Sequence, residues 1–107
     1  MTNTLITKSE LDYLNYINRY FLILYNILLE EQCTKSNHQL YNYINCIISE
    51  IYESLEKRFK YRTIKCEDDI VYIHGVFGTG YGIFVDYKIH PFDPYIENSM
   101  YIEEIEL

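Results

Sequence analysis

"GVFGTGYGIF", residues 75–84, contains all four glycines of this 107-residue chain. The runs on either side, residues 70–77 and 83–89, are rich in β-branched and aromatic side chains, which is typical of β-strands. Because glycine adopts positive φ at little steric cost, we predict that residues 78–80 turn the chain in a β-hairpin. Gly75 and Gly82 are then expected to mark a bulge or a close approach of another group to the backbone.

A phosphate-binding loop is the alternative interpretation of these glycines, and the spacing argues against it. A dinucleotide loop needs G-x-G-x-x-G before a helix, but Ile83 stands at the third glycine position and a strand pattern follows. A P-loop needs Gly-Lys-Ser/Thr, which the chain lacks. The catalytic-loop and Asp-Phe-Gly sequences that accompany the glycine loop of protein kinases are also missing. The sequence therefore favours the hairpin.

Before the glycines, apolar residues recur every three or four positions, which predicts two helices. Thr7 and Glu10 fit a capping box at the start of the first helix, residues 8–31. Ser36 and Gln39 fit a second capping box at the start of the second helix. Since only a few residues join these two long helices, they must run antiparallel.

This order of elements places the chain in the α+β class, as a single domain. We predict an N-terminal antiparallel helical hairpin over residues 8–62, packed on a small C-terminal antiparallel β-sheet over residues 63–107. The order is α-α-β-β-β, with room for one short additional strand. Residues 100–107 are expected to form an edge strand rather than a helix, with glutamates that discourage pairing to other chains.

Charge is unevenly distributed along the chain. Residues 1–62 contain seven acidic and seven basic side chains, whereas residues 63–107 contain nine acidic side chains and two lysines, so the second part carries the whole net charge of −7. An anionic sheet repels nucleic-acid phosphates and attracts a basic protein surface. We therefore expect a basic protein partner and no direct binding to nucleic acid. The residues expected to contact that partner are Glu67, Asp68, Asp69, Asp86, Glu97, Glu103, Glu104 and Glu106.

The function that fits this pattern is a small acidic module that inhibits or regulates a partner by occupying its basic groove. Carboxylates along the strands would imitate the phosphates of a nucleic acid, and charge would steer the encounter. Ile, Asn, Tyr and Lys are frequent, which indicates an AT-rich genome. The small size, the charge and this codon bias are compatible with a phage- or virus-encoded, anti-CRISPR-like inhibitor of a host nuclease. The plainer interpretation is that the charge only provides solubility.

Several other functions are disfavoured by residue types and spacing. No secretory signal pattern is present and residues 20–29, the longest apolar stretch, are too short to span a bilayer, so we expect a cytoplasmic protein without membrane contact. Cys33, Cys46 and Cys66 are odd in number and show no paired spacing, which argues against a disulfide framework. Without a C-x-x-C or H-x-x-x-H pair we predict neither a metal site nor a cofactor.

Two chemical alternatives remain open. The basic run "KRFKYRTIK", residues 57–65, would contact phosphate, but these cations also suit the negative C-terminal end of a helix. A pocket near the glycine hairpin, close to His74, Tyr81 and His90, would make the protein a ligand-binding or catalytic domain. No nucleophile, base and acid can be grouped from the sequence, so we predict no catalytic residue.

The first helix also indicates self-association. Its residues 20–29 are apolar on nearly every side and need cover from more than the sheet, so we expect a homodimer through the helices, with Leu22, Tyr25 and Leu29 in its interface. A purely structural homo-oligomer is the third functional hypothesis. Beside the main apolar stripe of this helix lies a second one, made of Tyr13, Tyr16, Tyr20, Ile23 and Ile27.

Overall fold

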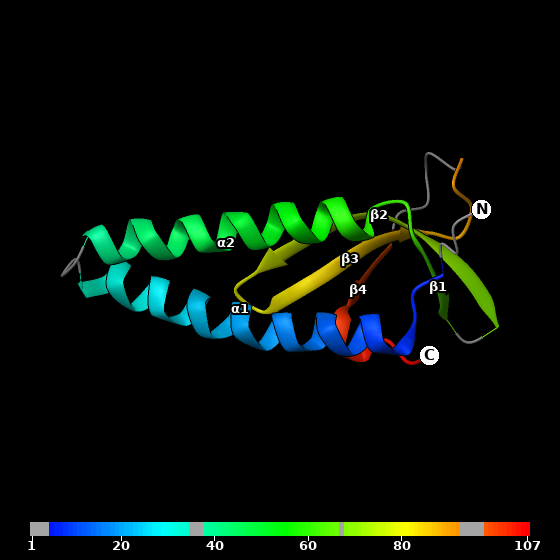
Figure 1. Ribbon diagram of the computed structural model, residues 1–107, viewed down its shortest axis with the longest axis horizontal. Coiled ribbons are helices and arrows are strands. Elements are labelled where there is room, and N and C mark those ends of the chain that lie inside the picture. The colour runs from blue at the N-terminus through cyan, green and yellow to red at the C-terminus, as the bar shows by residue number, and fades with distance from the viewer. Residues whose placement is uncertain (1–4, 35–37, 67, 93–97) are drawn as a thin grey trace.

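The computed structural model describes residues 5–34, 38–66, 68–92 and 98–107. Two helices are followed by a four-stranded antiparallel sheet, and the helices pack against the sheet, which confirms the predicted α+β class (Figure 1). The elements are α1 (Lys8–Thr34), α2 (His38–Phe59), β1 (Thr63–Cys66), β2 (Asp69–Thr79), β3 (Gly82–Lys88), β4 (Asn98–Tyr101) and the short 3₁₀-helix η1 (Ile102–Glu104).

Helix α1 begins with the predicted capping box. The Glu10 N–H donates to Thr7 Oγ1 at 3.2 Å, and the Thr7 N–H donates to Glu10 Oε1 at 3.2 Å. Each side chain thereby satisfies a backbone donor that the first helical turn leaves unpaired. The second predicted capping box includes Ser36, which lies outside the described residues, and α2 is described from His38.

Helix α2 ends at Phe59, three residues before the end of the region assigned to the helical hairpin. Tyr61 adopts a φ of 70°, a left-handed conformation that stops a right-handed helix. The Tyr61 N–H donates to the carbonyl of Ile73 at 2.9 Å, and the Arg62 N–H donates to the carbonyl of Phe59 at 3.1 Å. The chain leaves the helix at this point because its backbone already pairs with β2.

The four strands form a meander in the order β1-β2-β3-β4. The glycine stretch is the predicted β2–β3 hairpin, but its turn lies later than expected, at Gly80 and Tyr81, between the paired residues Thr79 and Gly82. Gly78 stays in β2, paired with Ile83, and Phe21 and Tyr52 lie so close to it that a side chain there would collide with them. A Cβ placed on Gly78 would lie 2.6 Å from Phe21 Cζ.

The predicted bulge occurs beside Gly75. The pairing of β2 with β3 shifts between Ile73 and Gly75, so one extra residue is inserted in β2. As a result Ile73 and Val76, which are three positions apart, are both buried on the face that meets the helices. A regular strand would have turned one of them to the opposite face.

The C-terminal tail is a strand only over its first part. Strand β4 ends at Tyr101, and the predicted continuation to residue 107 is wrong because η1 follows. Ile102 and Ile105 are both buried, at 0% and 5% exposure. Positions three apart share a side in a 3₁₀ turn but point to opposite faces in a strand, so the core determines the conformation here.

The hydrophobic core lies between the helical hairpin and one face of the sheet. Helix α2 packs on β2, while α1 packs on β3 and η1. Figure 1 shows that the connected ends of the two helices extend past the β2–β3 turn. The sheet therefore covers only part of the hairpin's length, and the molecule is elongated, at 49 × 30 × 24 Å.

Candidate interaction surfaces

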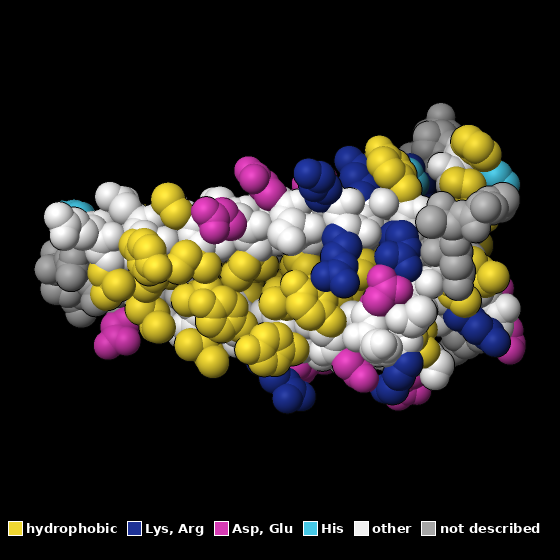
Figure 2. Space-filling model, viewed as in Figure 1, with side chains coloured by type: hydrophobic (Ala, Val, Ile, Leu, Met, Phe, Trp, Pro, Cys, Tyr) yellow, Lys and Arg dark blue, Asp and Glu magenta, His cyan; other side chains and the backbone are white. Residues whose placement is uncertain are grey.

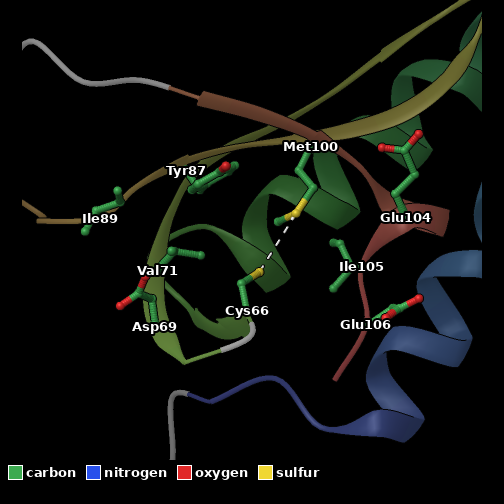
Figure 3. Close-up of a pocket in the computed structure, with 9 residues that line it drawn as sticks. All are labelled: Cys66, Asp69, Val71, Tyr87, Ile89, Met100, Glu104, Ile105 and Glu106. Atoms are coloured by element: carbon green, nitrogen blue, oxygen red, sulfur yellow. Dashed lines mark hydrogen bonds between the residues drawn. The ribbon is translucent and has the colours of Figure 1, made fainter.

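The first candidate site is a pocket of about 360 Å³ where the two edge strands of the curved sheet approach each other (Figure 3). Cys66 on β1 and Met100 on β4 are at opposite edges in the strand order, yet their sulfur atoms lie 3.9 Å apart. Val71, Tyr87 and Ile105 line the same space. Apolar side chains and carboxylates both contribute to the lining, and we refer to this pocket as the acidic pocket.

Three carboxylates surround the acidic pocket. Figure 3 shows Asp69 on the β2 side and Glu104 and Glu106 on the side of the C-terminal tail. The other lining residues are uncharged, so the formal charge of the lining is −3. Lys65, the neighbour of Cys66 in β1, is exposed and follows the strand alternation to the opposite face. A lining that combines apolar side chains with carboxylates suits a cation on a hydrocarbon stem, such as a Lys or Arg side chain.

The structure distributes the remaining predicted partner-binding residues over different surfaces. Asp86 lies on the other face of the sheet, where Ser99 Oγ donates to its Oδ1 at 2.6 Å. Glu103 turns toward α1, where its Oε1 lies 3.2 Å from Arg19 Nε. Asp68 is exposed in the turn that precedes β2. Glu67 and Glu97 lie outside the described residues.

Cations of the basic run are engaged within the molecule. Arg62 forms a two-pronged ion pair with Glu10, with Nη1 to Oε2 and Nη2 to Oε1 both at 2.8 Å. These hydrogen bonds hold the pKa of Glu10 at about 2, below its ordinary 4.5, while burial acts in the opposite direction. Arg58 lies 4.7 Å from the ring centre of Tyr13. Through Arg58 and Arg62 the basic run thus joins the end of α2 to the start of α1, which is a structural role.

The residues of the predicted hairpin pocket do not come together. Tyr81 is 85% exposed at the tip of the hairpin. His74 lies in the middle of β2 and lines a separate hollow of about 260 Å³ with Pro91 and Phe92. His90 accepts a hydrogen bond from the Phe92 N–H at 3.3 Å. Tyr81 therefore lies at the turn end of the hairpin, apart from the hollow that His74 lines.

The second candidate site is the side of the helical hairpin that faces away from the sheet, which we call the apolar helix face. Figure 2 shows hydrophobic side chains in a continuous area along both helices. A shallow groove of about 190 Å³ runs between the helices and is lined by Tyr13, Ile17 and Ile47 among others. The residues that form this face are Tyr13, Tyr16, Tyr20, Ile23 and Ile27 of α1 with Leu40, Tyr43 and Ile47 of α2.

The three predicted dimer-interface residues lie on another side of α1. Tyr25 packs against the core, with its ring centre 5.7 Å from that of Phe21. Leu22 is half-buried and Leu29 is 44% exposed. At 100° of rotation per residue, Leu22 and Leu29 are turned about 100° or more from Ile23, which belongs to the apolar helix face.

Sequence reasoning missed a buried polar contact that holds α1 to the sheet. Asn18 is 0% exposed; its Nδ2 donates to Tyr101 Oη at 2.7 Å, and its Oδ1 accepts the Ile83 N–H at 2.7 Å. Gly82 lies between these partners, with a φ of 126°, and a Cβ there would approach Tyr101 Cε1 to 2.5 Å. The sequence feature that could have revealed this contact is Asn18 itself, because a residue four positions after Leu14 lies on the apolar side of the helix.

No helix among the described residues is long and apolar enough to cross a membrane. Nor does that part of the chain contain a group of three or more His, Cys, Asp or Glu side chains arranged to hold a metal ion. Comparison with protein-family models, with curated proteins and with solved structures found no match.

Proposed function

We propose that this protein is a small acidic binding module that docks on a basic surface of a protein partner through the acidic pocket. The observation that carries the proposal is the placement of Asp69, Glu104 and Glu106 around one pocket that also has apolar lining residues, with no cation among the residues that line it. Two of these residues come from the tail and one from β2, so the local charge arises from the tertiary structure.

A Lys or Arg side chain of the partner is the group that this pocket suits best. Its hydrocarbon stem would contact Tyr87, Ile89 and Met100, while its charged end would meet the carboxylates at the rim. An ion pair at a fully exposed site contributes little, about 0–1 kcal/mol, because water screens it. Apolar contact along the stem would add to that amount. A partner cation would therefore bind more tightly in the pocket than beside a single exposed carboxylate elsewhere on the surface.

The wider surface favours the same class of partner. Asp68 extends the negative charge on the β1–β2 side, and the C-terminal part of the chain carries the whole net charge of −7. A groove that normally holds nucleic acid offers closely spaced Lys and Arg side chains, so occupying it would inhibit that partner. Inhibition of a host nuclease by a phage- or virus-encoded protein belongs to this class of function.

The test is affinity capture from the native cell or its infected host with three forms of the full chain. The pocket variant Asp69→Asn/Glu104→Gln/Glu106→Gln is compared with wild type and with a control, Asp12→Asn/Glu30→Gln/Glu53→Gln. Both variants remove three negative charges, but the control changes exposed helical residues. We expect a basic protein to be captured by wild type and control and lost with the pocket variant.

Two further measurements define the contact. Ionic strength of about 1 M shortens the Debye length to about 3 Å, so it should release the partner. Ile89→Ser, at a pocket residue that is 56% exposed, should weaken capture without affecting folding if apolar contact with a side-chain stem matters. Equal capture by pocket and control variants, or binding indifferent to salt, would refute the proposal.

A further inference from the structure

We propose that two copies of this chain associate through the apolar helix face to form a four-helix arrangement. This inference is independent of the proposed function, because the acidic pocket is lined by residues of the strands and the tail and by none of α1 or α2. It also locates self-association on a different side of α1 from Leu22 and Leu29.

The exposure of this face is unusual for side chains of its type. Tyr16 is 69% exposed, Ile23 is 59% exposed and Tyr43 is 66% exposed. Single exposed apolar residues are ordinary, but a contiguous set marks an interaction surface. Figure 2 shows hydrophobic side chains gathered over this part of the helical hairpin.

The spacing of the exposed residues indicates a helical partner. In α1 they follow one another at intervals of three, four, three and four, from residue 13 to residue 27. In α2 the exposed residues 40 and 43 are three apart, and the half-buried Ile47 follows four positions later. This is the repeat by which helices pack side by side at a shallow angle. The buried residues of α1 that pack within the chain, Leu14, Phe21, Leu24 and Leu28, use intervals of the same kind. The face is thus a second helix-packing seam that has its partner outside the chain.

The available area matches what a stable dimer needs. Seven of the eight residues of the face have exposed fractions between 36% and 69%. With about 200 Å² for each fully exposed side chain of this size, their exposed area adds up to roughly 700 Å². A specific protein interface of standard size buries about 800 Å² on each partner. The face is therefore large enough by itself.

Charge favours a second copy over a basic or an acidic partner. None of the eight side chains of the face is charged, and the helical part of the sequence contains seven acidic and seven basic residues. A two-fold contact brings the same patch of both copies together, so a neutral patch meets no repulsion. Charged groups of both signs lie next to the face: Arg58, which lies over the Tyr13 ring, and Glu50, which lines the groove between the helices.

The test is sedimentation of the full chain between about 1 µM and about 500 µM, a range that covers interfaces of modest affinity. We expect a mass near twice 13.0 kDa at the upper end, and no further growth because a two-fold contact is closed. Ile23→Glu would bury two charges at the contact and should raise the dissociation constant at least about tenfold.

Leu29→Glu is the matched control, because it places the same charge at an exposed apolar position of the same helix but on another side. It should leave the dimer intact. Circular dichroism checks that both variants fold, and Tyr16→Ser, at a 69% exposed residue, provides a milder second change. The dimer should persist at high salt and in the pocket variant, in contrast to partner docking.

Three outcomes would overturn this inference. The first is a wild-type protein that stays monomeric throughout the concentration range. Binding of a different protein to the apolar helix face of such a monomer would overturn the inference in the same way. The second is a dimer disrupted by Leu29→Glu and not by Ile23→Glu or Tyr16→Ser. The third is a dimer that dissociates when salt rises, because that would indicate a charged contact.

Discussion

Replacing Glu10 with glutamine removes one charge from the ion pair that joins the start of α1 to the end of α2. Glutamine retains the capping-box geometry, so the change isolates the carboxylate's charge. Two hydrogen bonds of 2.8 Å connect Glu10 to Arg62, and the side chains of Arg62 and Glu10 are only 22% and 20% exposed. Two-pronged pairs of this kind are among the stronger charged contacts in proteins.

The magnitude follows from the pKa of Glu10. A fall from 4.5 to about 2 on folding corresponds to about 3.4 kcal/mol of stabilisation at neutral pH. Because water still reaches part of both side chains and screens the pair, we expect the variant to lose about 2 kcal/mol at pH 7.

The pH dependence gives the sign of the effect. The folded-state pKa of Glu10 lies below its unfolded value, so the stabilisation is present above pH 4.5 and disappears as the pH falls toward 2. At pH 3 roughly 40% of the difference between wild type and Glu10→Gln should remain, and near pH 2 very little.

Urea denaturation of both proteins at several pH values measures this difference. Glu56→Gln is the matched control, because Glu56 Oε1 lies 3.5 Å from Lys60 Nζ in a pair whose Glu56 side chain is 51% exposed. It should cost less than about 0.5 kcal/mol at any pH. If Glu10→Gln lost the same free energy at pH 2 as at pH 7, or no more than Glu56→Gln, the reasoning would be wrong.

Three other substitutions test contacts between α1, α2 and the sheet, each measured by thermal or urea unfolding. Gly82→Ala should destabilise by about 2 kcal/mol or more, because φ is positive there and the new Cβ collides with neighbours, whereas Gly75→Ala, with nothing within 4 Å of its Cβ, should have little effect. Asn18→Leu should cost about 2–4 kcal/mol by leaving the buried Ile83 N–H without its acceptor; a loss below about 1 kcal/mol would contradict this assignment. Tyr52→Phe should cost about 1–2 kcal/mol, because the Tyr52 hydroxyl both donates to and accepts from the β2 backbone, and no change would show that these bonds are unimportant.

Local patterns in the sequence were sufficient for the elements and the class of the fold. The Thr7–Glu10 capping box, the helical spacing of apolar residues and the alternation around the glycines each depend on neighbours within four positions. These short-range effects act the same way in any chain, so α1, α2, the β2–β3 hairpin and the bulge at Gly75 could be predicted. Negative charge concentrated after residue 62 was likewise evident from composition.

Contacts between distant residues decided the rest. Gly78 lies in β2 with no room for a side chain, because Phe21, 57 positions earlier, occupies the space beside it, and η1 replaces a strand because Ile102 and Ile105 both enter the core. The acidic pocket has the same origin. Nothing in the sequence separates Glu104 from Asp86, but the curvature of the sheet brings β1 near β4 and leaves these two carboxylates on different surfaces. Residue types and their periodicity therefore determined the elements, whereas the packing of the sheet on the helices determined which side chains share a surface, because that depends on contacts that no local pattern records.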